Sequence, residues 1–297
     1  MKKITRAFFV LIIGFFVVVA SSCLSKGELA EHLVQSGMNA IIKNRENIVD
    51  SFDDFTPEQE YYIGRSVAAQ ILTKYDLYES KMMNKYLNYI CATLVANTEE
   101  EVVPYKGYSI GIIDTDEVNA FATSGGHILI SKGLINCAQS EDALAAVIAH
   151  EIAHIQFKHN IKAIMTNRKS EAFSKVGVSF VKEFTGGVID DVLDLFDDII
   201  TEGISTLVDS GYSQVNEFDA DKRALAIMAA AGYRPEAMND MLLVLEENTD
   251  TQEGWGKTHP TPKKRMDNLK KQYNKYNVKD TTESRTARFL AVMSNFN

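Results

Sequence analysis

Two histidines and a glutamate form the part of this sequence best suited to chemistry. The run His150-Glu151-Ile152-Ala153-His154 places two imidazole rings four residues apart. Residues with that spacing share one face of a helix, so both rings can reach the same ion. Zinc is commonly bound by such a pair, and Glu151 could accept a proton from a zinc-bound water that attacks a carbonyl. The run predicts a hydrolytic zinc site, although both histidines could instead be ordinary helix residues.

A third protein ligand is required, and the segment around residue 217 can supply it. Glu217 and Asp221 are again four residues apart on one face of an expected helix. Glu217 would complete a His-His-Glu set, and Asp221 would accept the free ring N–H of a ligating histidine. The alternative is an acidic pair on a solvated face. His159 lies on the other side of a continuous helix from His154, which predicts a surface residue.

Helices must position these side chains. Ser140 is an N-cap for the long helix that carries His150 and His154, with acidic residues in its first turn. A second helix is expected from near Gln214 to Ala231, where Gly232 stops it. Further helices are predicted at about 57–75, 80–96, 236–247 and 262–275.

The apolar runs 108–113 and 125–130 predict two strands, with a turn at Ser124-Gly125-Gly126. The fold class is therefore α+β, mostly helical, with one small sheet beside the motif helix. The chain has 297 residues with 45% hydrophobic and 24% charged residues, which is typical of globular proteins and excludes disorder throughout. From Cys23 onward it has 28 basic and 40 acidic side chains, a net charge of −12 that argues against a nucleic-acid partner.

The first residues predict an export signal. A basic stretch, 1–6, precedes an uncharged run from Ala7 to Ala20, which is short for a membrane span. The junction from Ala20 to Cys23 is similar to a bacterial lipobox, although Leu is more usual where Ala20 stands. We expect a signal peptide at 1–22 and a lipid on Cys23, with the protein held in the outer membrane of the bacterial envelope, facing the periplasm. An ordinary secretory signal or an uncleaved anchor is the alternative.

Three further expectations concern the exported part. Residues 23–50 suggest a helical tether, and 51–290 the catalytic domain. The acidic, partly apolar stretch 170–210 predicts an amphipathic helical hairpin with a solvated face, or else a lid over the site. Cys91 and Cys137 could form a disulfide in an oxidising compartment or stay free.

Four blocks in order resemble a known family. These are the runs 119–122, 125–128 and 132–135; the histidine motif; the run 217–221; and His259-Pro260 followed by Arg265. Over about 56–275 the chain resembles the HtpX, CAAX-prenyl-protease and Oma-type gluzincin zinc metallopeptidases. It is closest in kind to periplasmic lipoprotein members of the BepA and LoiP type, because 170–210 is too acidic to span a bilayer.

The resemblance implies a zincin-type domain and a role for each matching residue. One Zn²⁺ per chain would be bound by His150, His154 and Glu217, with Glu151 as the general base. His259 and Asn119 would be catalytic contacts, and Asp221 and Arg265 would support the ligands. Gly125, Gly126 and His127 would lie in an edge strand that binds substrate.

The resulting prediction is a zinc metalloendopeptidase that acts on misfolded or assembling envelope proteins. The rival prediction is a chaperone or assembly factor that uses the same groove with little or latent proteolysis. A membrane-anchored binding protein without metal would require the motif to arise by accident.

Overall fold

A three-stranded mixed sheet lies within the part of the computed structural model that can be described, which comprises residues 56–98, 103–163, 211–248, 258–259, 262–279 and 281–296. The order is β1 (Ser109–Ile113), β3 (His127–Ser131), β2 (Ala120–Thr123). β1 is parallel to β3, and β2 is antiparallel to it. The signal peptide, the tether and the 170–210 hairpin predicted from the sequence lie outside the described residues.

The sheet corrects one expectation drawn from the resemblance. Gly125, Gly126 and His127 were expected in an edge strand, but the two glycines form the turn between β2 and β3, and His127 is the first residue of β3. β2 is the edge strand, whereas His127 begins the central strand. The chain reverses at Gly125 and Gly126, whose φ angles of 81° and 95° suit glycine.

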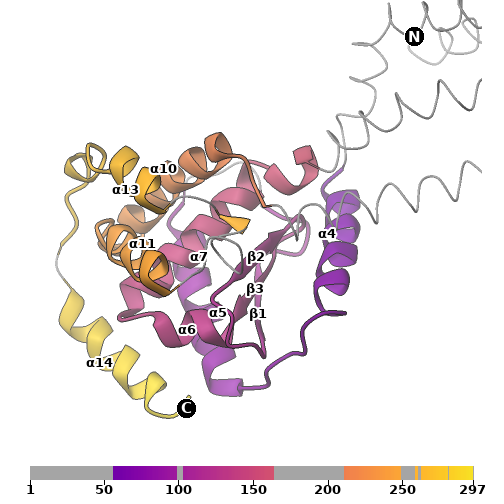
Figure 1. Ribbon diagram of the computed structural model, residues 1–297, viewed down its shortest axis with the longest axis horizontal. Helices are drawn as coiled ribbons and strands as arrows, with labels where there is room; N and C mark the ends of the chain where they lie inside the picture. Colours follow the sequence, from indigo (N-terminus) through magenta and orange to yellow (C-terminus); the bar gives the residue numbers. More distant parts are fainter. Residues whose placement is uncertain are drawn as a thin grey trace, which may run out of the picture. The chain divides into compact units, whose positions relative to one another are not determined.

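Strand side chains alternate between two apolar layers, as a period of two requires. Ile110, Ile112, Ile128 and Ile130 belong to the main core. Phe121 and Leu129 instead pack with Val67 and Ile71 of α4 (Pro57–Ile71). Helix α4 therefore covers the opposite face of the sheet from helix α7 (Figure 1).

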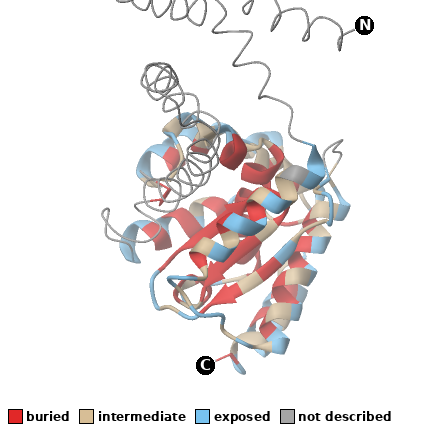
Figure 2. Ribbon diagram, turned by 90° about the vertical axis from the view of Figure 1, so that its right-hand side faces the viewer, coloured by how far each residue is buried: buried red, intermediate tan, exposed pale blue. Residues whose placement is uncertain are grey.

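Helix α7 (Glu141–Gln156) is the central helix of the main core. The Ser140 hydroxyl accepts a hydrogen bond from the Ala143 amide at 3.1 Å, so the predicted cap is confirmed. Every residue of α7 is buried, because α7 packs against helices on several sides and against β2. Figure 2 shows buried residues in the strands and on the inner faces of the helices. The helices that contact α7 are α5 (Lys81–Ala96), α10 (Gln214–Ala230), α11 (Ala237–Asn248) and α14 (Thr282–Met293).

The α+β prediction is confirmed, with differences at element ends. The expected helix 57–75 ends at Ile71, and the expected helix 262–275 divides into α13 (Pro262–Leu269) and a 3₁₀ turn, Tyr273–Lys275. The hydrophobic pattern did not predict β2 as a separate strand, nor the short helix α6 (Lys132–Cys137) or α14. β2 and α6 have only four and six residues, so local pattern alone does not reveal them.

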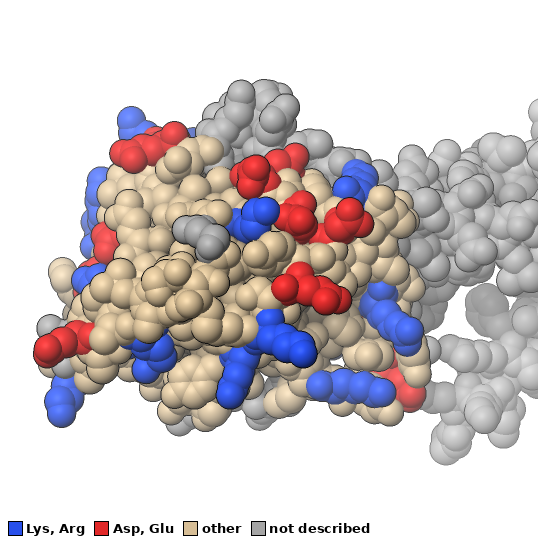
Figure 3. All heavy atoms as spheres, turned by 90° about the horizontal axis from the view of Figure 1, so that it is seen from below, with Lys and Arg blue, Asp and Glu red and all other residues tan. Residues whose placement is uncertain are grey.

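Cys91 and Cys137 are both free thiols, and Cys91 is buried in α5. Within the described part of the chain, no helix has the length and apolar character needed to cross a bilayer. The face in Figure 3 carries basic and acidic side chains near one another, as solvated surfaces commonly do.

Candidate metal centre and active site

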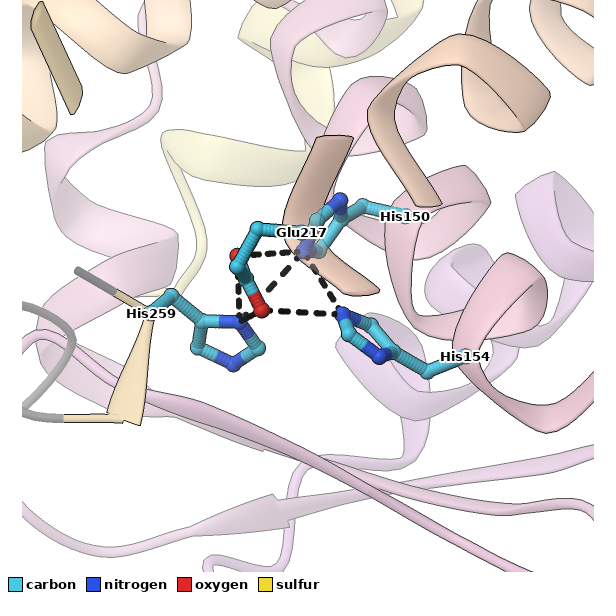
Figure 4. Close-up of side chains that lie close together, drawn as sticks. All are labelled: His150, His154, Glu217 and His259. Atoms are coloured by element: carbon cyan, nitrogen blue, oxygen red, sulfur yellow. Dashed lines mark hydrogen bonds and ion pairs between the residues drawn. The ribbon is translucent and has the colours of Figure 1, made fainter. Parts of the chain in front are cut away.

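Four buried side chains converge between α7, α10 and the segment at 258–259. His150, His154, Glu217 and His259 each offer one ligand atom, and these atoms lie within 4.8 Å of one another (Figure 4). Glu217 Oε2 is 3.4 Å from His150 Nε2, and Glu217 Oε1 is 3.3 Å from His154 Nε2. One turn of α7 and one turn of α10 thus face each other. Together they supply two imidazoles and a carboxylate, which are groups that zinc prefers.

The ring orientations fit a bound cation. Asp221 Oδ1 lies 3.0 Å from His150 Nδ1, and His159 Nδ1 lies 2.9 Å from His154 Nδ1. Since a carboxylate only accepts, His150 carries a proton on Nδ1, and Nε2 is the ring nitrogen left to bind an ion. The two Nε2 atoms are 3.0 Å apart. Lone pairs aimed at the same point beside a carboxylate are stabilised by a positive ion there.

Arg265, from α13, supports the two buried carboxylates of the site. It is fully buried and donates to both oxygens of Asp221, at 2.8 Å from Nε and 2.6 Å from a terminal nitrogen. Its other terminal nitrogen is 3.1 Å from Glu217 Oε2. A bidentate guanidinium of this kind holds both carboxylates in one orientation.

Glu151 is the buried group whose environment is most unusual. Its side chain is fully buried, yet neither carboxylate oxygen has a hydrogen-bond partner among the described residues. His259 Nε2 lies 3.7 Å from Glu151 Oε1. Burial raises the pKa of Glu151, although His259 and His150 act in the opposite direction. A carboxylate in this state is a stronger base than one in water.

The ionisation of two of the three proposed ligands suits metal binding. For His150, burial and Arg265 lower the pKa, but the hydrogen bonds with Asp221 and Glu217 outweigh them and raise it to about 9, so zinc must displace a proton from that ring. Burial lowers the pKa of His154 well below its ordinary value, which keeps the ring neutral. Burial alone would raise the pKa of Glu217, but His259 and Arg265 outweigh it and hold that pKa well below the usual range. A neutral imidazole and a charged carboxylate are the forms that bind zinc.

His259 lies beside the proposed ligands. Its Nδ1 is 3.1 Å from Glu217 Oε1 and 3.3 Å from His150 Nε2, and its role as a transition-state contact stays a prediction. The Thr258 hydroxyl donates to Asn119 Oδ1 at 3.0 Å. The buried Asn119 side chain therefore holds the segment that carries His259.

His159 is a correction to the sequence prediction. It was expected at the surface, but it is only 4% exposed and contacts His154. The prediction assumed that the helix continues, whereas α7 ends at Gln156 and Lys158 has a left-handed φ of 56°. The reversal brings His159 back beneath the helix end.

Tyr212 is a site residue that the sequence analysis missed. Its ring stacks on His154 with centroids 4.0 Å apart and planes 18° apart. Its hydroxyl donates to the Ala122 carbonyl of β2 at 3.2 Å. An aromatic residue just before the Ser213 cap of α10 was the available signal, but aromatic residues are more often simply core.

Gly125, Gly126 and His127 lie at the turn between β2 and β3. An added Cβ on Gly125 would stand 2.4 Å from Tyr61 Cα, and one on Gly126 would stand 2.1 Å from the Gly107 oxygen. The His127 ring is 5.1 Å from the ring of Tyr61. The turn therefore packs against Tyr61 and Gly107, whereas the four-residue cluster is built from α7, α10 and the segment 258–259.

An apolar cavity opens beside the cluster, between α4 and β2. It is lined by Val67 and Ile71 of α4, by residues 120–122 of β2, and by residues near the cluster that include Tyr212 and His259. The cavity therefore follows β2 toward His259.

Comparison with known proteins agrees with this geometry. The model of "Peptidase family M48" matches residues 82–273. The Beta-barrel assembly-enhancing proteases of Yersinia pestis and Escherichia coli K12 are each 24% identical, over 76% and 73% of this chain and 46% and 44% of their own lengths. The Mitochondrial metalloendopeptidase OMA1 of Schizosaccharomyces pombe is 24% identical over 78% of this chain and 66% of its own length.

The chain spans less than half the length of the bacterial relatives just named. The family match, in contrast, covers more than half of this chain and includes all four residues of the cluster. The chain belongs to peptidase family M48.

Proposed function

We propose that this protein is a zinc metalloendopeptidase of the bacterial envelope, attached to the outer membrane through a lipid on Cys23. The observation that carries the proposal is the convergence of His150, His154 and Glu217 beside Glu151, a buried carboxylate without a hydrogen-bond partner among the described residues. The domain plan proposed with it is a signal peptide at 1–22, a tether at 23–50 and a catalytic domain at 51–290, in which 170–210 is a hairpin or lid.

The chain's own groups have distinct tasks in this reaction. Zinc, when bound, acts as a Lewis acid toward the peptide carbonyl and lowers the pKa of water. Glu151 accepts the proton of the attacking water as the new C–O bond forms, and returns it to the amide nitrogen as the C–N bond breaks. Asp221 and Arg265 keep His150 and Glu217 in position throughout.

The position of strand β2 favours a protein or peptide as the substrate. This strand is the sheet edge nearest α7, and an extended chain can add its backbone to such an edge. The adjoining cavity is lined by apolar residues of α4 and β2 and also by polar residues, among them Asn160, Thr258 and His259. The bacterial relatives are named as proteases that enhance β-barrel assembly, and we propose misfolded or assembling envelope proteins as the substrates of this chain.

A Glu151→Gln variant tests the assigned base. Glutamine keeps the shape but cannot accept the proton, so we expect zinc content equal to wild type and casein cleavage reduced about 100- to 10,000-fold. Metal analysis and fragment mass spectrometry on the full chain measure the two quantities. The exposed Glu236→Gln variant is the matched control and should cleave like wild type. A zinc-loaded Glu151→Gln protein that cleaves at the wild-type rate would refute the proposal.

One observation favours a second function. With His259 Nδ1 among the ligand atoms, the cluster offers four donors, the number that closes a structural zinc site. With a closed site, proteolysis would be latent. The protein could still bind envelope proteins at the cavity beside β2, as a chaperone or assembly factor does.

A His259→Ala variant separates the two functions. If His259 occupies the fourth position, its removal should increase casein cleavage while zinc stays bound. If His259 stabilises the transition state, cleavage should fall. The double variant Glu151→Gln/His259→Ala is the control, because any gained cleavage that survives in it does not come from this site.

A further inference from the structure

The two histidines of the motif are supported differently. His150 Nδ1 rests on the Asp221 carboxylate, which Arg265 holds from its far side. His154 Nδ1 meets no carboxylate among the described residues, and the group within hydrogen-bond distance of it is the Nδ1 atom of His159, at 2.9 Å. One ligand is thus backed by an ion pair and the other by a second imidazole.

The direction of this hydrogen bond follows from where the His154 lone pair points. Its Nε2 faces His150 Nε2 at 3.0 Å and Glu217 Oε1 at 3.3 Å, so a metal would be bound there. A ring that binds through Nε2 carries its proton on Nδ1 and needs an acceptor for it. His159 Nδ1 is placed to be that acceptor, which requires the proton of His159 to be on Nε2.

Two neighbouring features hold His159 at this position. The left-handed Lys158 turns the chain back after α7, and the Lys158 ammonium is paired with Glu60 of α4 at 2.6 Å. Asn160 accepts from the Ser124 hydroxyl at 3.4 Å. Residues on both sides of His159 are therefore anchored to other elements, so its ring is not free to leave His154.

Tyr212 restrains the same ligand from a second direction. It stacks on the face of the His154 ring, while His159 meets the ring edge at Nδ1. The Tyr212 hydroxyl is bound to Ala122 of β2. Stacking limits the tilt of the ring but does not select a tautomer, because an aromatic face has no acceptor for the Nδ1 proton. That selection is left to His159.

We propose that His159 is a positioning residue for His154, which accepts the Nδ1 proton and so holds Nε2 toward the metal centre. The inference rests on the proposed zinc site and assigns to a neutral imidazole the task that carboxylates or carbonyl groups usually perform. His159 touches neither substrate nor metal, and it acts through His154 alone.

Two substitutions separate the acceptor from the bulk of the ring. His159→Phe keeps an aromatic ring but removes the acceptor, and we expect about 10- to 100-fold weaker zinc binding. His159→Asn retains an acceptor oxygen near the Nδ1 position and should bind zinc within a few-fold of wild type. Competition with a chromophoric chelator measures affinity on the full chain, and circular dichroism checks the fold.

The outcomes distinguish this inference from the proposed function. Wild-type protein that binds no zinc would overturn the zinc site itself. Wild-type protein that binds zinc, with a folded His159→Phe variant that binds it equally well, would overturn the positioning role alone. An Asn variant as weak as the Phe variant would show that no acceptor is involved and would equally overturn it.

A measurement on unaltered protein keeps the inference testable if the variants do not fold. Long-range ¹H–¹⁵N spectra of the zinc-loaded wild-type protein report the tautomer of each histidine. We expect His154 protonated on Nδ1 and His159 protonated on Nε2. A His159 ring protonated on Nδ1 would contradict the proposal.

Discussion

At the scale of single residues, Arg265 is the group on which the buried charges of the site depend. Burying an ion is costly unless it is paired, and Arg265 pairs with Asp221 and Glu217 together. Burial by itself would raise the pKa of Asp221, but Arg265 outweighs it and keeps that pKa below its ordinary value. The arginine therefore keeps Asp221 charged and able to accept from His150.

The first prediction concerns this arginine. Arg265→Met retains much of the side-chain volume but leaves two buried carboxylates without their cation. We expect the free energy of unfolding of the zinc-free protein to fall by about 3–5 kcal/mol. Urea unfolding in the presence of a chelator measures it.

An exposed ion pair provides the matched control. Lys270 and Asp267 are 2.6 Å apart, but their side chains are 68% and 59% exposed. Lys270→Met should leave the urea midpoint nearly unchanged, because solvent screens such pairs. Equal effects of the two substitutions would show that Arg265 does not act through buried charge.

At the scale of elements, the turn between β2 and β3 sets the position of the sheet edge. Gly126 has a φ of 95°, and an added Cβ would overlap the Gly107 oxygen. Gly232, at the end of α10, has a similar φ of 80°, but an added Cβ there meets nothing within 4 Å. The two glycines share the same backbone requirement and differ in their surroundings.

The second prediction uses that difference. Gly232→Ala should lower the free energy of unfolding by about 1–2 kcal/mol, the usual penalty for a left-handed alanine. Gly126→Ala should lower it further, since the loop at Gly107 must also move. Chemical unfolding of both variants tests this, and a smaller loss for Gly126→Ala would mean that the turn adapts without strain.

At the scale of the whole molecule, the metal centre joins segments that are far apart in the chain. α7 supplies two histidines, α10 supplies Glu217, α13 supplies Arg265, and the segment 258–259 supplies the fourth histidine. At its other end, α7 is tied to α14 by the Arg285–Asp142 pair at 2.8 Å. An ion in the cluster would therefore stabilise contacts between several helices at once.

The third prediction is that removing zinc destabilises the whole described unit. A ligand at about 1,000 times its Kd adds about 4 kcal/mol to stability. For a domain of this size that corresponds to a loss of roughly 8–16 °C in Tm on chelation. Calorimetry with and without EDTA measures the change. Glu217→Ala, which lacks a proposed ligand, should show little response to EDTA, and an unchanged wild-type Tm would contradict the prediction.

Local features of this protein were determined by the sequence itself. The spacing of His150 and His154, the caps at Ser140 and Ser213, and the alternating isoleucines each depend on neighbours within one or two helix turns or a short strand. Helix and strand periods convert such spacing directly into a shared face. The helix that carries the motif and the acidic pair on a second helix could therefore be predicted.

Only the tertiary structure decided how those faces meet. His159 reaches His154 because the chain leaves the helix at Lys158, and Tyr212 reaches it because α10 packs against α7. The ligand-like placement of His259 and the assignment of β2 as the edge strand rest on contacts between segments distant in the sequence. Such contacts depend on how whole elements share buried surface, and no local period encodes that.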